Sequence, residues 1–186
     1  MNVLNAKTSV SVGVTSTRII GTFADLNDAF DADIAGTISG LGNEEIILNA
    51  AITVSQFNTL AAKTSGIITA TISDNDMATL AGIAESGHAL TISVTDAVVV
   101  AADLNVLDNK TTGAVTITST TIAGSSSDIN TVYASNGISG LGDEVLIITD
   151  TNISASSLLT LDNNTTGALT PMSAPGSNTT VTFIGQ

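Results

Sequence analysis

Residues 125–137 read SSSDINTVYASNG, and this stretch decides the fold class. Ser125 is suited to cap a helix N-terminus, because its hydroxyl can accept a hydrogen bond from the amide three residues further on. Asp128, at that third position, faces the positive end of the helix dipole. Apolar residues follow at Ile129 and Val132, on one face of a helix, and the closing glycine favours the conformation that ends it. The stretch therefore predicts one short amphipathic helix.

The same pattern of cap, apolar stripe and glycine occurs six times, at a mean spacing of about 26 residues. Two copies are weaker, because one has no hydroxyl at the cap position and the other has serine in place of Asp or Gln at the third. The predicted caps are Thr22, Thr53, Ser73, Val100, Ser125 and Ser154, with third-position residues Asp25, Gln56, Asp76, Asp103, Asp128 and Ser157. The predicted helix stops are Gly36, Gly66, Gly87, Gly113, Gly137 and Gly167.

Stretches rich in β-branched residues follow the glycines and predict strands. Strand–helix–strand units give parallel strands through right-handed crossovers, and units this short favour stacked rungs over a large doubly wound sheet. We therefore expect an α/β protein: a β-α solenoid of about six strand–short-helix rungs with a parallel sheet, plus terminal β-strands. The helices should line one side of it. The predicted strands lie in residues 46–48, 67–72, 90–94, 115–118 and 145–149.

A heptapeptide is duplicated at an offset of 100 residues: ISGLGNE at 38–44 and ISGLGDE at 138–144. We expect both copies to add a loop before their strand. A phosphate-binding role is disfavoured, because the glycines follow a helix and acidic residues come next. Both loops are therefore expected to be structural.

The chain divides into three predicted segments. Residues 1–17 form an N-terminal strand and attachment segment, 18–170 the solenoid repeats, and 171–186 a C-terminal loop and strand. Alternating polar and apolar residues at 9–14 and 179–184 predict half-exposed strands. These two strands are expected either to cap the stack or to pair with each other as an attachment module.

Composition excludes several classes of protein. The chain has 186 residues, 43% of them apolar, with 4 Lys and Arg against 17 Asp and Glu and a net charge of −13. The absence of cysteine excludes iron–sulfur, thiol and disulfide chemistry and the common cysteine-based zinc sites. The charge argues against nucleic-acid and anionic-membrane partners. We also find no secretory signal at the N-terminus and no apolar run long enough to span a bilayer.

Few residues suggest a chemical site. His88 is the single histidine, and with no evident partner we expect it near a helix end at the surface. Calcium is the best ligand candidate, because it prefers oxygen ligands and acidic pairs occur in the sequence. The candidate metal ligands are Asp74, Asp76, Asp143 and Glu144. We favour capping and solvated faces over a bound cation for them, and we predict no catalytic residue and no cofactor.

The repeats carry a resemblance. Residues 101–116, AADLNVLDNKTTGAVT, resemble the Thr/Ala/Asp-rich, cysteine-free repeats of very large surface proteins from marine cyanobacteria. Similar repeats occur in virion proteins of the phages that infect them. The resemblance covers roughly residues 18–170 and implies no catalytic residues.

The resemblance motivates an expectation about function. We expect a non-enzymatic structural protein of a phage particle, either a capsid decoration or a fibre-type subunit at the virion surface. Its partners would be other virion or surface proteins, held through the terminal strands, or further copies of itself. The alternative is a cell-surface adhesin or exopolymer-binding module outside the cell. A polysaccharide-active enzyme is disfavoured, because the chain has one Tyr, four Phe and no Trp.

Overall fold

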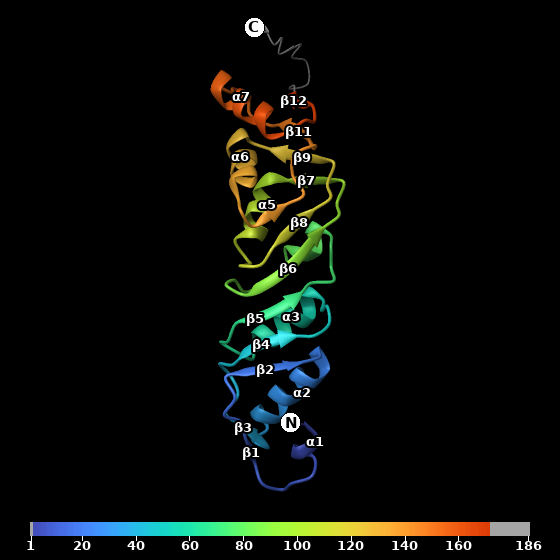
Figure 1. Cartoon of the computed structure of the whole chain (residues 1–186), viewed down its shortest axis with the longest axis vertical. Helices are drawn as coiled ribbons and strands as arrows, with labels where there is room; N and C mark the ends of the chain where they lie inside the picture. Colours follow the sequence, from blue (N-terminus) through green and yellow to red (C-terminus); the bar gives the residue numbers. More distant parts are fainter. Residues whose placement is uncertain (1, 172–186) are drawn as a thin grey trace.

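The computed structural model describes residues 2–171 and shows an α/β protein built from parallel strands and short helices. Its elements follow one another along a long axis, from β1 near one end to β12 at the other (Figure 1). The predicted strand at 179–184 lies outside the described residues.

Seven helices occur in the described part of the chain, one more than the sequence predicts. The additional helix is α1, a single turn close to the N-terminus. Consecutive helices pack on one another, except that α3 and α4 share little contact. The helices are α1 (Asn2–Asn5), α2 (Phe23–Ile34), α3 (Val54–Ala61), α4 (Met77–Leu80), α5 (Ala101–Asp108), α6 (Ser126–Ala134) and α7 (Ala155–Asn164).

The strands are short, and every pairing between them in the described residues is parallel, which confirms the predicted parallel arrangement. They form three sheets with the orders β1-β3, β10-β8-β6-β5-β4-β2 and β12-β11-β9-β7. The strands are β1 (Val12–Gly13), β2 (Arg18–Gly21), β3 (Ile38–Ser39), β4 (Glu45–Leu48), β5 (Ile68–Thr71), β6 (Ala89–Val94), β7 (Val98–Val100), β8 (Val115–Ile117), β9 (Thr121–Gly124), β10 (Ile138–Ser139), β11 (Val145–Ile148) and β12 (Leu169–Pro171).

Most repeats contain two strands, whereas the sequence predicts one. Three of the additional strands lie directly before a helix: β2 precedes α2, β7 precedes α5 and β9 precedes α6. Each is three or four residues long, so that it gives too few alternations for a periodicity signal. Their β-branched residues, such as Val98 and Ile122, are the signal that could have identified them.

The core is built from ladders of equivalent apolar residues in successive strands. Val99 of β7 pairs in register with Ile122 of β9, which pairs with Leu146 of β11. All three are at most 1% exposed. Buried helix residues such as Leu104 and Ile129 join the same apolar cluster. Each of these apolar residues is thus covered by its partner in the adjacent strand and by the helices.

Five of the six predicted helix starts are confirmed. The hydroxyls of Thr22, Thr53, Ser125 and Ser154 accept the predicted N3 amide hydrogen bond, and α5 begins after Val100 without a side-chain cap. The prediction for Ser73 is wrong. Asp76 caps α4 instead, because the amide of Ser73 is still bonded to the carbonyl of Ile52 in the neighbouring repeat and the helix begins later.

The predicted helix-stop role of the glycines holds only in part. Gly36 has a φ of 76° after α2, as a helix-ending glycine requires. Gly66, Gly113 and Gly167 do not adopt positive φ. A Cβ on each would lie between 1.8 and 2.3 Å from a backbone carbonyl oxygen of the neighbouring repeat. Glycine is therefore needed there because two backbones approach closely, and not because a helix ends.

The N-terminal strand is shorter than predicted and belongs to a two-stranded sheet. Of residues 9–14, only Val12 and Gly13 are in a strand, which pairs with β3. β1 and β12 lie at opposite ends of the described structure (Figure 1), and the predicted C-terminal strand that could pair with β1 lies outside the described residues.

The two halves of the chain repeat the same topology at an offset of about 100 residues. In the first, β1 pairs with β3, and β2, β4 and β5 pair in succession; in the second, β8 pairs with β10, and β9, β11 and β12 pair in succession. The first two residues of each copy of the duplicated heptapeptide form β3 and β10, and residues 40–44 and 140–144 connect these strands to β4 and β11. The predicted loop before a strand is thus confirmed for 40–44 and 140–144, and the glycines at positions 40, 42, 140 and 142 have positive φ. The two-residue strands at the start of each copy were not predicted.

Candidate functional site

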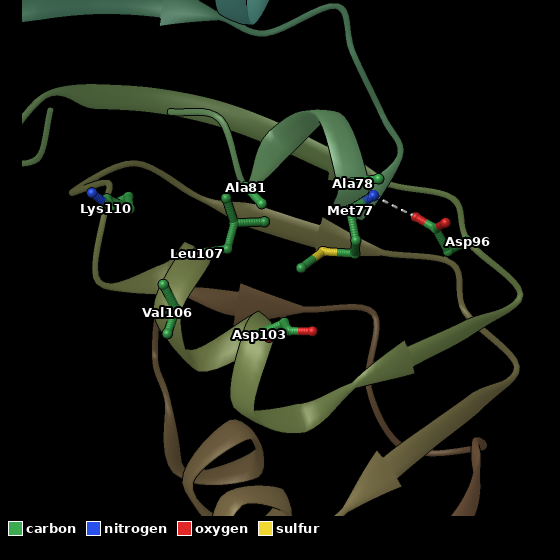
Figure 2. Close-up of a pocket in the computed structure, with 8 residues that line it drawn as sticks. All are labelled: Met77, Ala78, Ala81, Asp96, Asp103, Val106, Leu107 and Lys110. Atoms are coloured by element: carbon green, nitrogen blue, oxygen red, sulfur yellow. Dashed lines mark hydrogen bonds between the residues drawn. The ribbon is translucent and has the colours of Figure 1, made fainter. Parts of the chain in front are cut away.

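A pocket of about 430 Å³ opens between α4 and α5 (Figure 2). It exists because α4 has only four residues, whereas α3 and α5 have eight each. Its walls are mostly apolar: the side chain of Met77 extends toward Leu107, beside Ala81 and Val106. Val106 is 59% exposed. The pocket thus offers apolar surface that the truncated helix leaves uncovered.

The charged residues around this pocket are engaged in holding the fold. The Asp96 carboxylate accepts a hydrogen bond from the Met77 amide at 2.8 Å, and Lys110 Nζ donates to the Ala84 carbonyl at 3.2 Å. Asp103 lies in the first turn of α5, where its negative charge interacts favourably with the helix dipole. The arrangement supports apolar contact and helix capping.

The calcium candidates Asp74 and Asp76 bind backbone amides. Asp76 Oδ1 accepts from the Thr79 amide at 2.9 Å, and this bond lowers the pKa of the Asp76 carboxyl. Asp74 Oδ2 accepts from the Val54 amide at 2.7 Å, and Val54 is the first residue of α3 in the preceding repeat. The two carboxylates therefore serve different helices.

Capping of a helix by an aspartate from the following repeat occurs more than once, and the sequence analysis did not predict it. Asp74, Asp96 and Asp150 each follow a strand and accept the first amide of the helix one repeat earlier: that of Val54, of Met77 and, at 2.6 Å, of Ser126. The signal is the tripeptide of Ile or Val, then Ser or Thr, then Asp, at 72–74, 94–96 and 148–150. Each aspartate links two repeats.

The other calcium candidates, Asp143 and Glu144, have different surroundings. Asp143 is exposed, whereas Glu144 is completely buried. Glu144 Oε2 accepts from the Gly142 amide at 2.9 Å and from the Tyr133 hydroxyl at 2.7 Å. Burial and the neighbouring Glu144 raise the pKa of Tyr133 above its ordinary value. Glu44 accepts from the Gly42 amide at 2.7 Å in the same way, so that both carboxylates brace their glycine loops.

Asparagines on the helices also bind the neighbouring repeat. Asn58 of α3 donates to the Gly82 carbonyl at 2.8 Å and accepts from the Ala84 amide at 3.0 Å. Asn105 of α5 donates to the Asp128 carbonyl, and Asn130 accepts from Asn164. These half-buried amides link each of these helices to the neighbouring repeat.

The expected surface position of His88 is wrong. The residue is only 9% exposed, and its ring packs edge-on against Phe57 with the ring centroids 5.2 Å apart. Nδ1 accepts the Ile68 amide hydrogen at 3.0 Å, which requires the neutral ring with its proton on Nε2. Burial lowers the pKa of His88, and the charge of Glu85 opposes that shift.

Residues 2–171 contain no group of three His, Asp or Glu side chains arranged to hold a metal ion. Over the same residues, no helix combines the length and the apolar character needed to cross a bilayer. No protein-family model, curated protein or solved structure matches the chain.

Proposed function

We propose that this protein is a non-enzymatic structural subunit of a phage particle, either a capsid decoration or a fibre-type subunit at the virion surface. Its parallel repeats would form a β-α solenoid of about six rungs that serves as a spacer or building block. The resemblance of residues 101–116 to repeats of cyanobacterial surface proteins and cyanophage virion proteins motivates the class of protein.

One structural observation supports a mechanical role. The side chains that most invite a chemical interpretation are engaged in bonds that hold the fold: Asp74, Asp96 and Asp150 cap helices of the preceding repeat, and His88 binds a strand amide. Polar side chains used in this way stabilise a stack of thin layers, because each bond crosses from one layer to the next. The net charge of −13 would keep the lateral surfaces of neighbouring molecules apart.

This proposal is tested by mass spectrometry and cryo-electron microscopy of virus particles purified from the sample that contains this sequence. We expect the chain at a copy number typical of structural proteins, with density that fits a narrow stack of parallel repeats. Its absence from particles would contradict the proposal.

The alternative is a cell-surface adhesin or exopolymer-binding module, and the open apolar pocket between α4 and α5 is the feature that favours it. A glycan-binding screen with the full chain separates the two functions. Saturable glycan binding that is lost on Val106→Asp, together with absence from particles, would support the alternative.

A further inference from the structure

The N-terminal end of the molecule resembles a surface in the second half of the chain. In that half, the preceding strands cover the surface. Strands β1 and β2 correspond, in the second half of the chain, to β8 and β9. There, β8 pairs with β6 and β9 pairs with β7, on the side facing the N-terminus. Among the described residues, β1 pairs with β3 alone and β2 with β4 alone. One strand edge of each is thus left without a described partner.

A groove of about 310 Å³ lies beside β2, next to α1. Ile19, Gly21 and Leu26 line it, together with Val3, which is 72% exposed, and Ile20, which is 61% exposed. Exposed apolar side chains next to a free parallel edge are the features of a surface that accepts another strand.

Two glycines show how this groove compares with its occupied counterpart. Gly21 ends β2 as Gly124 ends β9, each directly before the hydroxyl that caps the next helix. A Cβ on Gly124 would lie 2.9 Å from Cβ of Ala101, which follows β7 in the covering repeat. At Gly21 the three nearest atoms belong to Asp25 and Leu26 of its own repeat. The space that Ala101 fills beside Gly124 is therefore part of the groove beside Gly21.

We propose that this groove receives residues 172–186 of a second copy of the chain, so that molecules stack head to tail. The segment that covers β8 and β9 inside the molecule, 89–101, has 13 residues, and the segment outside the described structure has 15. It contains TTVTFI at 179–184, which is uncharged and rich in β-branched residues, as an added strand requires.

Position identifies a second copy as the partner. β12, the last described strand, lies far along the long axis from β2 (Figure 1), and residues 172–186 follow it in the sequence. This inference deepens the proposed function, on which it rests, by naming the partner of the terminal strands.

Complementation between two blocked variants tests the proposal by sedimentation velocity with the full chain. Gly21→Val fills the groove, and Phe183→Asp places a charge in the donor segment. We expect the native chain to form oligomers that grow with concentration, each variant alone to be monomeric, and an equal mixture of the two to form a dimer with one chain of each. Ala123→Val, the matched enlargement on interior strand β9, should associate like the native chain.

Circular dichroism establishes that each variant is folded, and Ile20→Lys replaces Gly21→Val if that variant unfolds. A native chain that stays monomeric, variants that still assemble alone, or a mixture without dimers would each overturn the inference. A monomeric chain that is nevertheless found in particles would overturn the inference and leave the proposed function standing. A chain that self-associates but is absent from particles would do the reverse.

Discussion

His88 accepts a hydrogen bond at a position where the next repeat uses a hydroxyl as the acceptor. Its Nδ1 accepts the Ile68 amide hydrogen at 3.0 Å, and Thr111 Oγ1 accepts that of Leu90 at 2.8 Å. Both acceptors satisfy a strand amide near the start of a repeat. The histidine additionally fills space against Phe57, so that it combines a polar and an apolar role.

Replacing His88 should therefore destabilise the fold more than removing a helix cap. His88→Ala leaves the Ile68 amide without its acceptor and opens a void beside Phe57, at a cost of about 2–3 kcal/mol. Ser125→Ala should cost about 1 kcal/mol, as is usual for an N-cap. Urea denaturation of both variants measures these costs, and the opposite order would refute the role given to His88.

The buried ring also makes stability depend on pH. The unfolded chain binds a proton at His88 as the pH falls through about 6.5, whereas the folded chain, whose His88 pKa is lowered by burial, resists it. Stability should thus decrease as the pH falls from about 6.5 toward about 5, above the range where carboxylates titrate. His88→Asn retains a polar side chain without a titrating ring and should flatten the curve in denaturant titrations. An equal slope in both proteins would exclude His88 as the cause.

At the scale of the element, the start of α4 separates two capping candidates. Ser73→Ala should leave the melting temperature unchanged, because Asp76 provides the cap that the sequence pattern assigns to Ser73. Asp76→Ala should lower it, since the Thr79 amide then loses its acceptor. Thermal melts of both variants in parallel decide between them, and a loss confined to Ser73→Ala would restore the original assignment.

The aspartates that cap the helix of the preceding repeat give a second prediction for the elements. Asp150→Ala removes the acceptor of the Ser126 amide and should cost about 1 kcal/mol. Asp143→Ala, at an exposed position only a few residues away, should stay within about 0.5 kcal/mol. Equal losses in chemical denaturation would mean that the bond between repeats contributes nothing.

Helix starts were predictable because capping is local: Thr22, Thr53 and Ser125 each bond an amide three residues away. Two features depend on the neighbouring repeat and therefore leave only a weak local signal. Asp74 caps a helix that begins 20 residues earlier, and His88 is buried by a phenylalanine from another repeat. The same reason explains Gly66, whose missing side chain makes room for a carbonyl of the repeat before it.

At the scale of the whole molecule, the alternation of strands and short helices was sufficient to predict parallel pairing. The pairing partners were less predictable. β4 pairs with β2 on one side and with β5 on the other. After the loop at 40–44, the chain therefore joins a different set of strands from the one it has just left. The duplicated heptapeptide marks this loop in the sequence, but no sequence pattern indicates which strand the strand after the loop will pair with.

The central claim is that successive repeats pair in parallel, residue over residue, and the absence of cysteine from the chain allows a direct measurement. Ser93, Thr116 and Ser139 lie in register on the exposed side of β6, β8 and β10. Adjacent parallel strands lie about 4.8 Å apart, within the range of Cα separations that a disulfide spans, whereas next-nearest strands lie about 9.6 Å apart.

Pairs of cysteines introduced at these positions should form disulfides under mild oxidation only where the two residues are in register on adjacent strands. Mass spectrometry of the intact, folded monomer detects these disulfides. Ser93→Cys with Thr116→Cys, and Thr116→Cys with Ser139→Cys, should each form an internal disulfide. Ser93→Cys with Ser139→Cys should not. Cross-linking of the distant pair, or none in the two adjacent pairs, would contradict the parallel stack.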